Sequence, residues 1–528
     1  MKRHKLLRGA LIGGGVGIVL TALFYLGDQL LRLPFLPFYL FDWLARALPG
    51  DVVTLGIDSI VNGILLLNIG ESTSETAKLI EQLLALLLFV LLWVVIGWVI
   101  ALISQRTRFS GQQAGLAAAL LLVGVLALAL NLPTVQQPLS LAWHLILVSL
   151  GGWAVGWALA AAREADTAAP DRRHFLLRFG GAVLGLTVGA WGIGWLFGRE
   201  PVDTGAEEAV DTSGEGMTLA DVATTPEELQ DRLEPAPGTR PEITPDGEFY
   251  RIDINTRPPA IQQSAWQLQV EGLFDNPRPL SLADLMALPA VTQPLTLSCI
   301  SNRIGGDLIS TAEWTGVRLG LVLEELGLQP AAQELYIEAE DGFYESVAMP
   351  DMMDPRTLLV YAMNGATLPQ EHGFPLRIYI PNRYGMKQPK WITRIEAIEG
   401  EGPGYWVDRG WSATAYPHII SIIDTVADGE RLADGRIPIG GIAWAGDRGI
   451  QQVEVQVDDS EWQTAELRLP PLSTLTWVQW RYDWPAASGE HTFRVRATDG
   501  EGSLQVGEES GVRPDGATGY HAVTRSIA

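Results

Sequence analysis

The sequence predicts a multi-domain protein with a five-helix transmembrane anchor, an α+β domain and a C-terminal β-sandwich of immunoglobulin-like size. Three observations predict this order. Five long apolar runs precede residue 200, short strands and helices mix from residue 249, and alternating strands separated by turn residues follow residue 418. The expected boundaries are 1–199 for the membrane region, 200–247 for a linker, 248–417 for the α+β domain and 418–528 for the sandwich.

The five apolar runs are each long enough to cross a bilayer core as a helix, which takes about 20 residues. Short-loop Lys and Arg cluster before the first run, around residues 106–108 and around residues 163–178, while the alternate loops are poor in cations. This pattern places the N-terminus in the cytoplasm and residues 198–528 outside the cytoplasm. The alternative for the first run is a cleaved signal peptide, although no small-x-small cleavage site follows it. The expected spans are 9–27, 79–104, 113–131, 141–162 and 175–197.

Three segments outside the spans have recognisable composition. Residues 28–48 mix aromatics, Pro and spaced charges, which is typical of a segment at the outer membrane interface or of an ordinary loop. Arg172-Arg173, followed by Phe and two Leu, resembles a twin-arginine export signal; a plain positive-inside cluster is the alternative. Because that route carries folded proteins, the match implies cofactor loading before export. Residues 200–247 are rich in Glu, Asp, Thr, Pro and Gly, which predicts a solvated, flexible linker.

The charge of the chain limits its partners. Of 528 residues, 47% are hydrophobic and 19% are charged, and the formal net charge is −24. Residues 1–199 carry 14 Lys and Arg against 10 Asp and Glu, a net +4, so residues 200–528 carry −28. An acidic soluble half argues against nucleic acid as a partner, because phosphate binding needs clustered Lys and Arg.

The single cysteine, Cys299, ends an apolar strand at 294–298 and precedes Asn302, Arg303 and a Gly pair at 305–306. With no second Cys, an intrachain disulfide is excluded. A thiolate beside an Arg and a Gly-rich backbone, whose amides can point inward, suits a soft metal. On these residues alone, a buried structural cysteine is the alternative.

Ordered blocks around Cys299 resemble the sulfite oxidase family of molybdopterin-dependent oxidoreductases, and the resemblance covers about 249–528. The blocks are LSCISN at 297–302, EWTGV at 313–317, a run at 363–377 with its continuation at 381–391, and YWVDRGW at 405–411. The resemblance implies a sulfite-oxidase-like molybdopterin domain, a Mo-molybdopterin cofactor bound directly through the Cys299 sulfur, and a C-terminal dimerisation domain. It also implies two-electron oxygen-atom transfer as the reaction.

The resemblance assigns candidate roles residue by residue. Cys299 and Arg303 are the candidate catalytic residues, and Cys299 is the metal ligand. Asp341 is a candidate cofactor contact, with a turn residue as the competing interpretation. A pterin phosphate needs charge-assisted donors, which a set of Lys, Arg and His would supply. The full set of cofactor-binding candidates is Tyr250, Arg251, Asn302, Asp341, His372, Arg377, Gly385, Lys387 and Lys390.

Two positions depart from the sulfite-binding members of the family. Those members carry an Arg two places beyond the Asn of the cysteine motif and a Tyr at the hinge, where this chain has Ile304 and Trp411. The loss weakens binding of a small dianion, because each charge-assisted hydrogen bond contributes roughly 1.5–3 kcal/mol. The expected substrate is a small oxyanion or an S-oxide, with sulfite left open.

The electron partner is expected outside this chain. There is no Cys-x-x-Cys-His haem motif, one Cys cannot hold an iron–sulfur cluster, and only His144 lies deep within a predicted span. An external cytochrome or a membrane quinone, surrounding lipid and a second copy of the chain in a homodimer are the expected partners. The alternative function is a cofactor-free, membrane-tethered scaffold or sensor that keeps the fold. A transporter is disfavoured, because the spans hold almost no charge.

Overall fold

A computed structural model describes residues 2–67, 69–70, 72–106, 112–113, 115, 117, 138–164, 169–198, 225, 228–429 and 431–528. The chain divides into two compact units. The first comprises Met1–Glu71, Glu75–Val202 and Asn255–Arg257; the second comprises Ser72–Ser74, Asp203–Ile254 and Pro258–Ala528.

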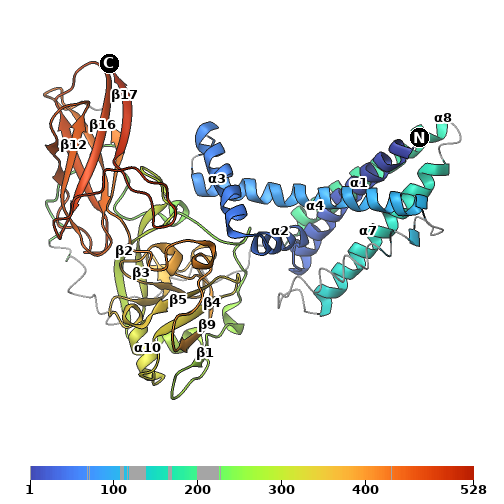
Figure 1. Cartoon of the computed structure of the whole chain (residues 1–528), viewed down its shortest axis with the longest axis horizontal. Coiled ribbons are helices and arrows are strands. Elements are labelled where there is room, and N and C mark those ends of the chain that lie inside the picture. The colour runs from blue at the N-terminus through green and yellow to red at the C-terminus, as the bar shows by residue number, and fades with distance from the viewer. Residues whose placement is uncertain are drawn as a thin grey trace. The chain divides into compact units, whose positions relative to one another are not determined.

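The first unit is helical. Its described helices are α1 (Lys2–Leu31), α2 (Leu36–Ala47), α3 (Gly50–Leu67), α4 (Thr73–Arg106), α7 (Pro138–Glu164) and α8 (Ala169–Phe197) (Figure 1). Four of them, α1, α4, α7 and α8, are long and apolar enough to cross a membrane. They coincide with four of the five expected spans. The remaining expected span, 113–131, lies outside the described residues.

Residues 28–48, expected to be an interfacial segment or an ordinary loop, contain the end of α1 and helix α2, and α3 follows directly. Pro37 stands in the first turn of α2, where a helix tolerates a proline because no backbone donor is lost. Phe38 and Asp42 of α2 are both buried. The Asp42 carboxylate accepts a 3.0 Å hydrogen bond from the backbone N–H of Thr256, in the short segment that belongs to the same unit. This local contact, invisible in the sequence pattern, helps to explain why a charged residue is buried in α2.

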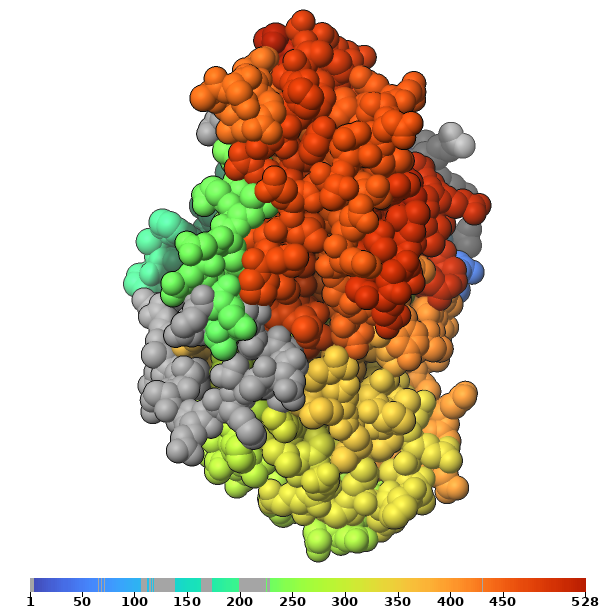
Figure 2. Space-filling model, turned by 90° about the vertical axis from the view of Figure 1, so that its left-hand side faces the viewer, coloured from blue at the N-terminus to red at the C-terminus, as the bar shows by residue number. Residues whose placement is uncertain are grey.

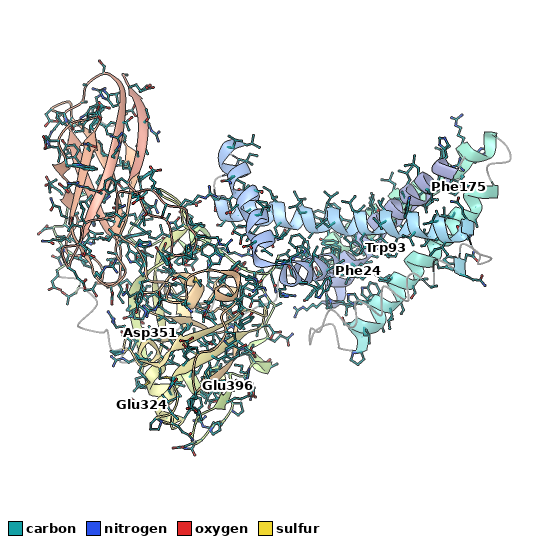
Figure 3. The ribbon with its side chains drawn as sticks, in the orientation of Figure 1. Phe24, Trp93, Phe175, Glu324, Asp351 and Glu396 are labelled. Carbon is teal, nitrogen blue, oxygen red and sulfur yellow. The ribbon has the colours of Figure 1, made fainter. Side chains whose placement is uncertain are left out.

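Close backbone contact joins α1 to α4. A Cβ atom on Gly13 would lie 2.1 Å from the Trp93 carbonyl oxygen, and one on Gly97 would lie 2.2 Å from the Gly9 oxygen. Only glycine permits this approach, which is typical of helices packed within membranes. The indole ring of Trp93 and the ring of Phe24 are fully buried at the centre of the helical unit (Figure 3).

The second unit begins with two sheets that follow the expected α+β pattern. One sheet has the order β1-β9-β4-β5 and the other has the order β2-β3-β6-β7, with β8 paired to β6. Only the β1–β9 pair is parallel among these described pairings. Short helices α9, α10 and α11 connect the strands. The bounds are β1 (Gln269–Gly272), α9 (Leu282–Met286), β2 (Ala290–Ser298), β3 (Ile309–Arg318), α10 (Leu319–Glu325), β4 (Glu334–Ala339), β5 (Tyr344–Ala348), α11 (Met349–Met352), β6 (Leu358–Met363), β7 (Ala366–Thr367), β8 (Arg377–Tyr379) and β9 (Ile392–Ile398).

The C-terminal strands form two four-stranded antiparallel sheets, with the orders β10-β11-β15-β14 and β13-β12-β16-β17. Alternate residues of β12 and β16 are buried, as a half-buried strand requires. Ile439, Val455, Trp480 and Val495 belong to one core cluster between these sheets. The bounds are β10 (Ile420–Val426), β11 (Ile437–Trp444), β12 (Ile450–Val457), β13 (Gln463–Thr464), β14 (Glu466–Leu467), β15 (Val478–Trp484), β16 (Gly489–Asp499) and β17 (His521–Ile527).

The described part of the expected linker, residues 228–247, is mostly exposed or half-buried, and several of its side chains bind the C-terminal strands. Arg240 forms an ion pair with Asp424 of β10, with 2.6 Å between Nη2 and Oδ1, and its carbonyl accepts a hydrogen bond from Gln479. In Figure 2 this green segment lies against the red-orange C-terminal residues. Composition suggested a tether because it counts charges, whereas Arg232, Arg240 and Glu242 have fixed partners. Most of the earlier part of the linker lies outside the described residues.

Candidate active site

Cys299 lies where a β-hairpin turns. Strand β2 ends at Ser298, which pairs with Ile309 at the start of β3, so residues 299–308 form the connecting loop. The Cys299 N–H donates to the Leu308 carbonyl at 2.9 Å. The thiol is buried, and its Sγ lies 3.0 Å from the Ser301 hydroxyl oxygen. Burial raises the pKa of the thiol, while hydrogen bonds from the Ser301 hydroxyl and from the backbone of Ser301 and Ile300 lower it.

Asn302 braces the same loop and leaves one donor unused. Its Oδ1 accepts a 3.0 Å hydrogen bond from the Leu308 N–H, while its Nδ2 is buried and has no hydrogen-bond partner. A buried amide donor without a partner costs free energy unless a ligand satisfies it. Arg303 follows directly and is half-buried. The loop thus presents a thiol and an amide donor together.

Tyr250 connects the cysteine loop with Gly385. A Cβ on Gly385 would lie 2.9 Å from the Tyr250 hydroxyl and 3.5 Å from the Ser298 carbonyl, so this position has no room for a side chain. Burial raises the pKa of the Tyr250 phenol; the neighbouring charge of Cys299 also raises it, and Arg377 opposes both. Tyr250 therefore lies within electrostatic reach of both Cys299 and Arg377.

Three of the predicted cations gather around a carboxylate that the sequence analysis missed. Asp253, whose side chain is fully buried, accepts from Arg251 Nε at 2.5 Å and from the Lys390 ammonium. Arg377 acts on the same carboxylate through its charge. Three cations around one anion leave a net charge of +2, which matches a phosphate monoester dianion. We call Arg251, Asp253, Arg377 and Lys390 the cation cluster.

Arg377 is the most deeply buried cation of the cation cluster. It is 4% exposed, its guanidinium carbon lies 4.8 Å from the centre of the Trp314 ring, and its Nη1 donates to the His372 carbonyl at 3.0 Å. Burial lowers the pKa of Arg377 to about 10, so it stays protonated at neutral pH.

His372 does not act as a cation here. Its Nε2 lies 3.0 Å from the carbonyl oxygen of Asp246, which can only accept, so Nε2 carries the proton and donates. Burial, followed by the charge of Lys390, lowers the pKa of His372 to about 3. A neutral His372 carries no positive charge toward a phosphate, and its assignment as a cofactor contact stays a prediction. His372 instead orients Arg377 through its backbone carbonyl.

Lys387 and Asp341 also have protein partners. The Lys387 ammonium lies 2.7 Å from Oε1 of Glu345, which is buried, and 3.3 Å from the Ser346 carbonyl. Burial raises the pKa of Glu345 to about 7, and Lys387 opposes that shift. Asp341 is buried and accepts a 3.0 Å hydrogen bond from the Phe343 N–H, as a turn residue does. The turn contact of Asp341 agrees with the competing interpretation of that residue, whereas the Lys387–Glu345 pair was not predictable from spacing.

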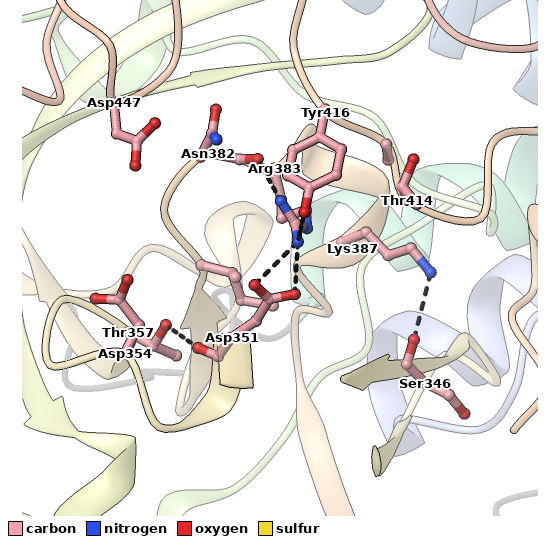
Figure 4. A network of polar contacts seen from close by, with 12 residues as sticks. Ser346, Asp351, Asp354, Thr357, Asn382, Arg383, Lys387, Thr414, Tyr416 and Asp447 are labelled. Carbon is pink, nitrogen blue, oxygen red and sulfur yellow. Dashed lines mark hydrogen bonds and ion pairs between the residues drawn. The ribbon is translucent and has the colours of Figure 1, made fainter. Parts of the chain in front are cut away.

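Arg383, absent from the candidates, fixes the loop that carries Tyr384 to Lys387. Its Nη2 lies 2.7 Å from Oδ2 of Asp351 and donates to the Tyr416 hydroxyl at 2.8 Å (Figure 4). Asp351 belongs to α11 and Tyr416 to the hinge before β10, so Arg383 joins the two halves of the second unit. Ile300, Tyr384 and Met386 also share an apolar cluster with β10 and β11, which strengthens this connection.

The donor set fits a molybdopterin. Among the described residues no group of three or more His, Cys, Asp and Glu is arranged to hold a metal ion. A metal at Cys299 would therefore take its other ligands from a cofactor. The unused Asn302 donor and the +2 charge of the cation cluster are what a phosphorylated, polar cofactor would satisfy. Fold and site together define a domain that binds a phosphorylated metal cofactor.

Comparison with known proteins gives the family. The model of the "Oxidoreductase molybdopterin binding domain" matches residues 255–406. "Uncharacterized oxidoreductase YuiH" of Bacillus subtilis is 34% identical over 152 residues, covering 29% of this chain and 75% of that protein. "Sulfite oxidase, mitochondrial" of Homo sapiens is 29% identical over 300 residues, covering 48% of this chain and 55% of that protein. The chain thus spans about half the length of the human relative.

Solved structures were also found. The sulfane dehydrogenase SoxCD from Paracoccus pantotrophus is 20% identical, with a TM-score of 0.47, over 63% of this chain and 98% of that chain. The score is too low to support a conclusion. The sequence relatives are sufficient: the chain belongs to the sulfite oxidase family of molybdopterin-dependent oxidoreductases. The predictions of a molybdenum-dependent oxidoreductase class and of Mo-molybdopterin as cofactor are confirmed.

Proposed function

We propose that this protein is a membrane-anchored, extracytoplasmic oxidoreductase that transfers an oxygen atom to or from a sulfur compound in a two-electron reaction. The observation that carries the proposal is Cys299, a buried cysteine in a hairpin loop with donors aimed at its sulfur, in the same folded unit as the cation cluster. Family membership supports the reaction class.

Each side chain has a role in this proposal. Bound molybdopterin supplies a metal that exchanges an oxygen atom and two electrons. Cys299 provides the protein sulfur ligand, and the Asn302 Nδ2 donates to a polar group of the cofactor. The cation cluster neutralises the phosphate, and Asp253 holds Arg251 and Lys390 in place. Tyr250, Asp341 and the backbone at Gly385 line the cofactor, and Lys387 uses the ammonium hydrogen that Glu345 and Ser346 leave available.

Arg303 is proposed to bind the substrate oxygen atoms. It follows Asn302 in the cysteine loop, and its charge suits a small oxyanion or a polar S-oxide. Beside it, Ile304 is apolar, and its Cδ1 lies 2.6 Å from where a Cβ on Gly519 would be. The cysteine loop, residues 299–308, holds one cation, and a single positive charge compensates only half of a dianion such as sulfite, so this loop favours an S-oxide.

The rest of the chain completes the proposal. Five transmembrane helices anchor the protein in lipid, with the N-terminus in the cytoplasm and the catalytic domain exported by the twin-arginine route. Residues 248–417 form the molybdopterin domain, and residues 418–528 form an immunoglobulin-like domain that pairs two copies. Electrons pass to or from an external cytochrome or a quinone. The four apolar helices and the antiparallel C-terminal sheets support this arrangement.

The proposal is tested by molybdenum and pterin analysis of the purified full-length protein, with Cys299→Ser as the test variant and Ser298→Ala as the control. Ser298 is the buried neighbour of Cys299 and its hydroxyl bonds only to backbone carbonyls. We expect about one molybdenum per chain in the parent and in the control, and loss of turnover in Cys299→Ser. A parent without metal, from a host that makes the cofactor, would support the cofactor-free scaffold instead.

Turnover assays with sulfite and with a dialkyl S-oxide then separate the two substrate classes. Arg303→Met should raise KM for the preferred substrate. A KM equal to that of the parent would exclude Arg303 from substrate binding.

A further inference from the structure

The Ser301 hydroxyl is the side-chain group placed against the cysteine sulfur. Its oxygen lies 3.0 Å from Cys299 Sγ, two residues along the same loop. Ser298, the buried serine on the other side of Cys299, uses its hydroxyl differently, with contacts of 3.3 Å to the Cys299 carbonyl and 3.4 Å to the Leu308 carbonyl. The two serines that flank Cys299 therefore have different hydrogen-bond partners, although the sequence does not distinguish them.

The direction of the Ser301 hydrogen bond follows from the chemistry of metal binding. In the metal-free protein either atom could donate, because both thiol and hydroxyl carry a hydrogen. A cysteine that binds a metal does so as a thiolate and has no proton. Ser301 must then be the donor, and its O–H dipole points its positive end at the sulfur.

We infer that Ser301 is a positioning residue that orients the Cys299 thiolate and raises the reduction potential of the metal bound to it; this inference rests on the proposed function. A hydrogen bond to a ligating sulfur draws electron density away from the metal, so the electron-rich reduced state is stabilised. Hydrogen bonds to cysteine sulfur tune metal centres in this way in other proteins. Because the Ser301 hydroxyl oxygen is only two bonds from its backbone and held within a short loop, the contact also limits rotation of the Cys299 side chain.

The experiment measures the midpoint potentials of the molybdenum in purified full-length protein, by redox titration monitored by electron paramagnetic resonance. Three variants are compared with the parent: Ser301→Ala, Ser301→Thr, which keeps a hydroxyl, and Ser298→Ala. We expect a shift to more negative potential in Ser301→Ala, parent-like values in Ser301→Thr and no shift in Ser298→Ala. Unchanged potentials in Ser301→Ala, with molybdenum bound, would overturn the inference.

Molybdenum content gives a second, independent result. If Ser301→Ala loses the metal while Ser301→Thr and Ser298→Ala keep it, the hydroxyl is needed to hold the thiolate and the inference stands. If Ser301→Thr loses the metal to the same extent as Ser301→Ala, the loop tolerates only serine for steric reasons and the inference fails. A parent that binds no molybdenum would overturn the proposed function itself, which distinguishes that failure from failure of the Ser301 assignment alone.

Discussion

Replacing Asp253 by Asn should destabilise the second unit strongly. The Asp253 side chain is fully buried and binds Arg251 and Lys390, whose side chains are 11% and 13% exposed. Asn has nearly the same shape but no charge and only one acceptor oxygen. The substitution leaves two mostly buried cations beside each other and beside Arg377, without their shared anion.

The expected cost is about 3–5 kcal/mol. Removal of one partner from a buried ion pair costs about 3–5 kcal/mol, because the remaining charge stays buried and uncompensated. At roughly 2 °C per kcal/mol for a large domain, this predicts a fall in Tm of roughly 6–10 °C. The cofactor content should also fall, because Arg251 and Lys390 lose the group that holds them in place.

Thermal unfolding of the full-length protein, followed by tryptophan fluorescence at pH 7, measures this cost. The control is Glu325→Gln, which removes the carboxylate of the exposed pair Arg278–Glu325, where both side chains are 48% exposed. Exposed pairs contribute at most about 1 kcal/mol, so the control should shift Tm by roughly 2 °C or less. A Tm for Asp253→Asn equal to that of the control would refute the argument that Asp253 compensates buried charge.

Three other predictions concern the same site. Arg377→Met and Lys387→Met should each lower molybdenum content per chain without changing turnover per bound metal, because each removes one charge-assisted donor. Elemental analysis combined with rate measurements checks this, and a fall in turnover per metal would contradict it. Gly385→Ala should cost about 1–3 kcal/mol and lower cofactor content, because the new Cβ would lie 2.9 Å from the Tyr250 hydroxyl; an unchanged Tm would contradict it. His372→Gln should reduce the loss of stability in acid: the folded-state pKa of His372 is lowered from 6.5 to about 3, so its contribution is present above pH 6.5 and is lost as the pH falls toward 3. By linkage this amounts to about 2 kcal/mol between pH 7 and pH 5, and chemical unfolding at both pH values should show a smaller difference in the variant than in the parent.

The sequence was most informative where the residues that act together are also close together in the chain. A lone cysteine at the end of an apolar strand, followed by Asn302 and a Gly pair, located the hairpin loop that the structure shows. The α+β pattern and the later alternating strands were also predictable, because strand burial repeats every second residue and turns carry Gly, Pro and Asp. Four of the five apolar runs correspond to four helices that are long and apolar enough to cross a membrane.

The sequence was least informative where a charge has a distant partner. Asp253 has two cationic partners. Arg251 is only two residues away, but Lys390 is 137 residues away, so the sequence did not show that one carboxylate binds both cations. Lys387 was predicted as a phosphate donor from its place in a motif, but Glu345, 42 residues earlier, holds it in an ion pair. Residues 228–247 looked like a solvated linker because Arg240 and Asp424 are far apart in the chain.

The sequence by itself determined the family, the cofactor class, the metal-binding candidate Cys299 and the order of apolar and acidic regions. These depend on residue identity and local order, which can be read directly from the sequence. Only the tertiary structure decided the buried position of His372, the anion that organises the cation cluster and the different hydrogen-bond partners of the serines on either side of Cys299. The physical reason is that a pKa, an ion pair or a hydrogen bond depends on burial and on groups within a few ångströms, and folding alone brings those groups together.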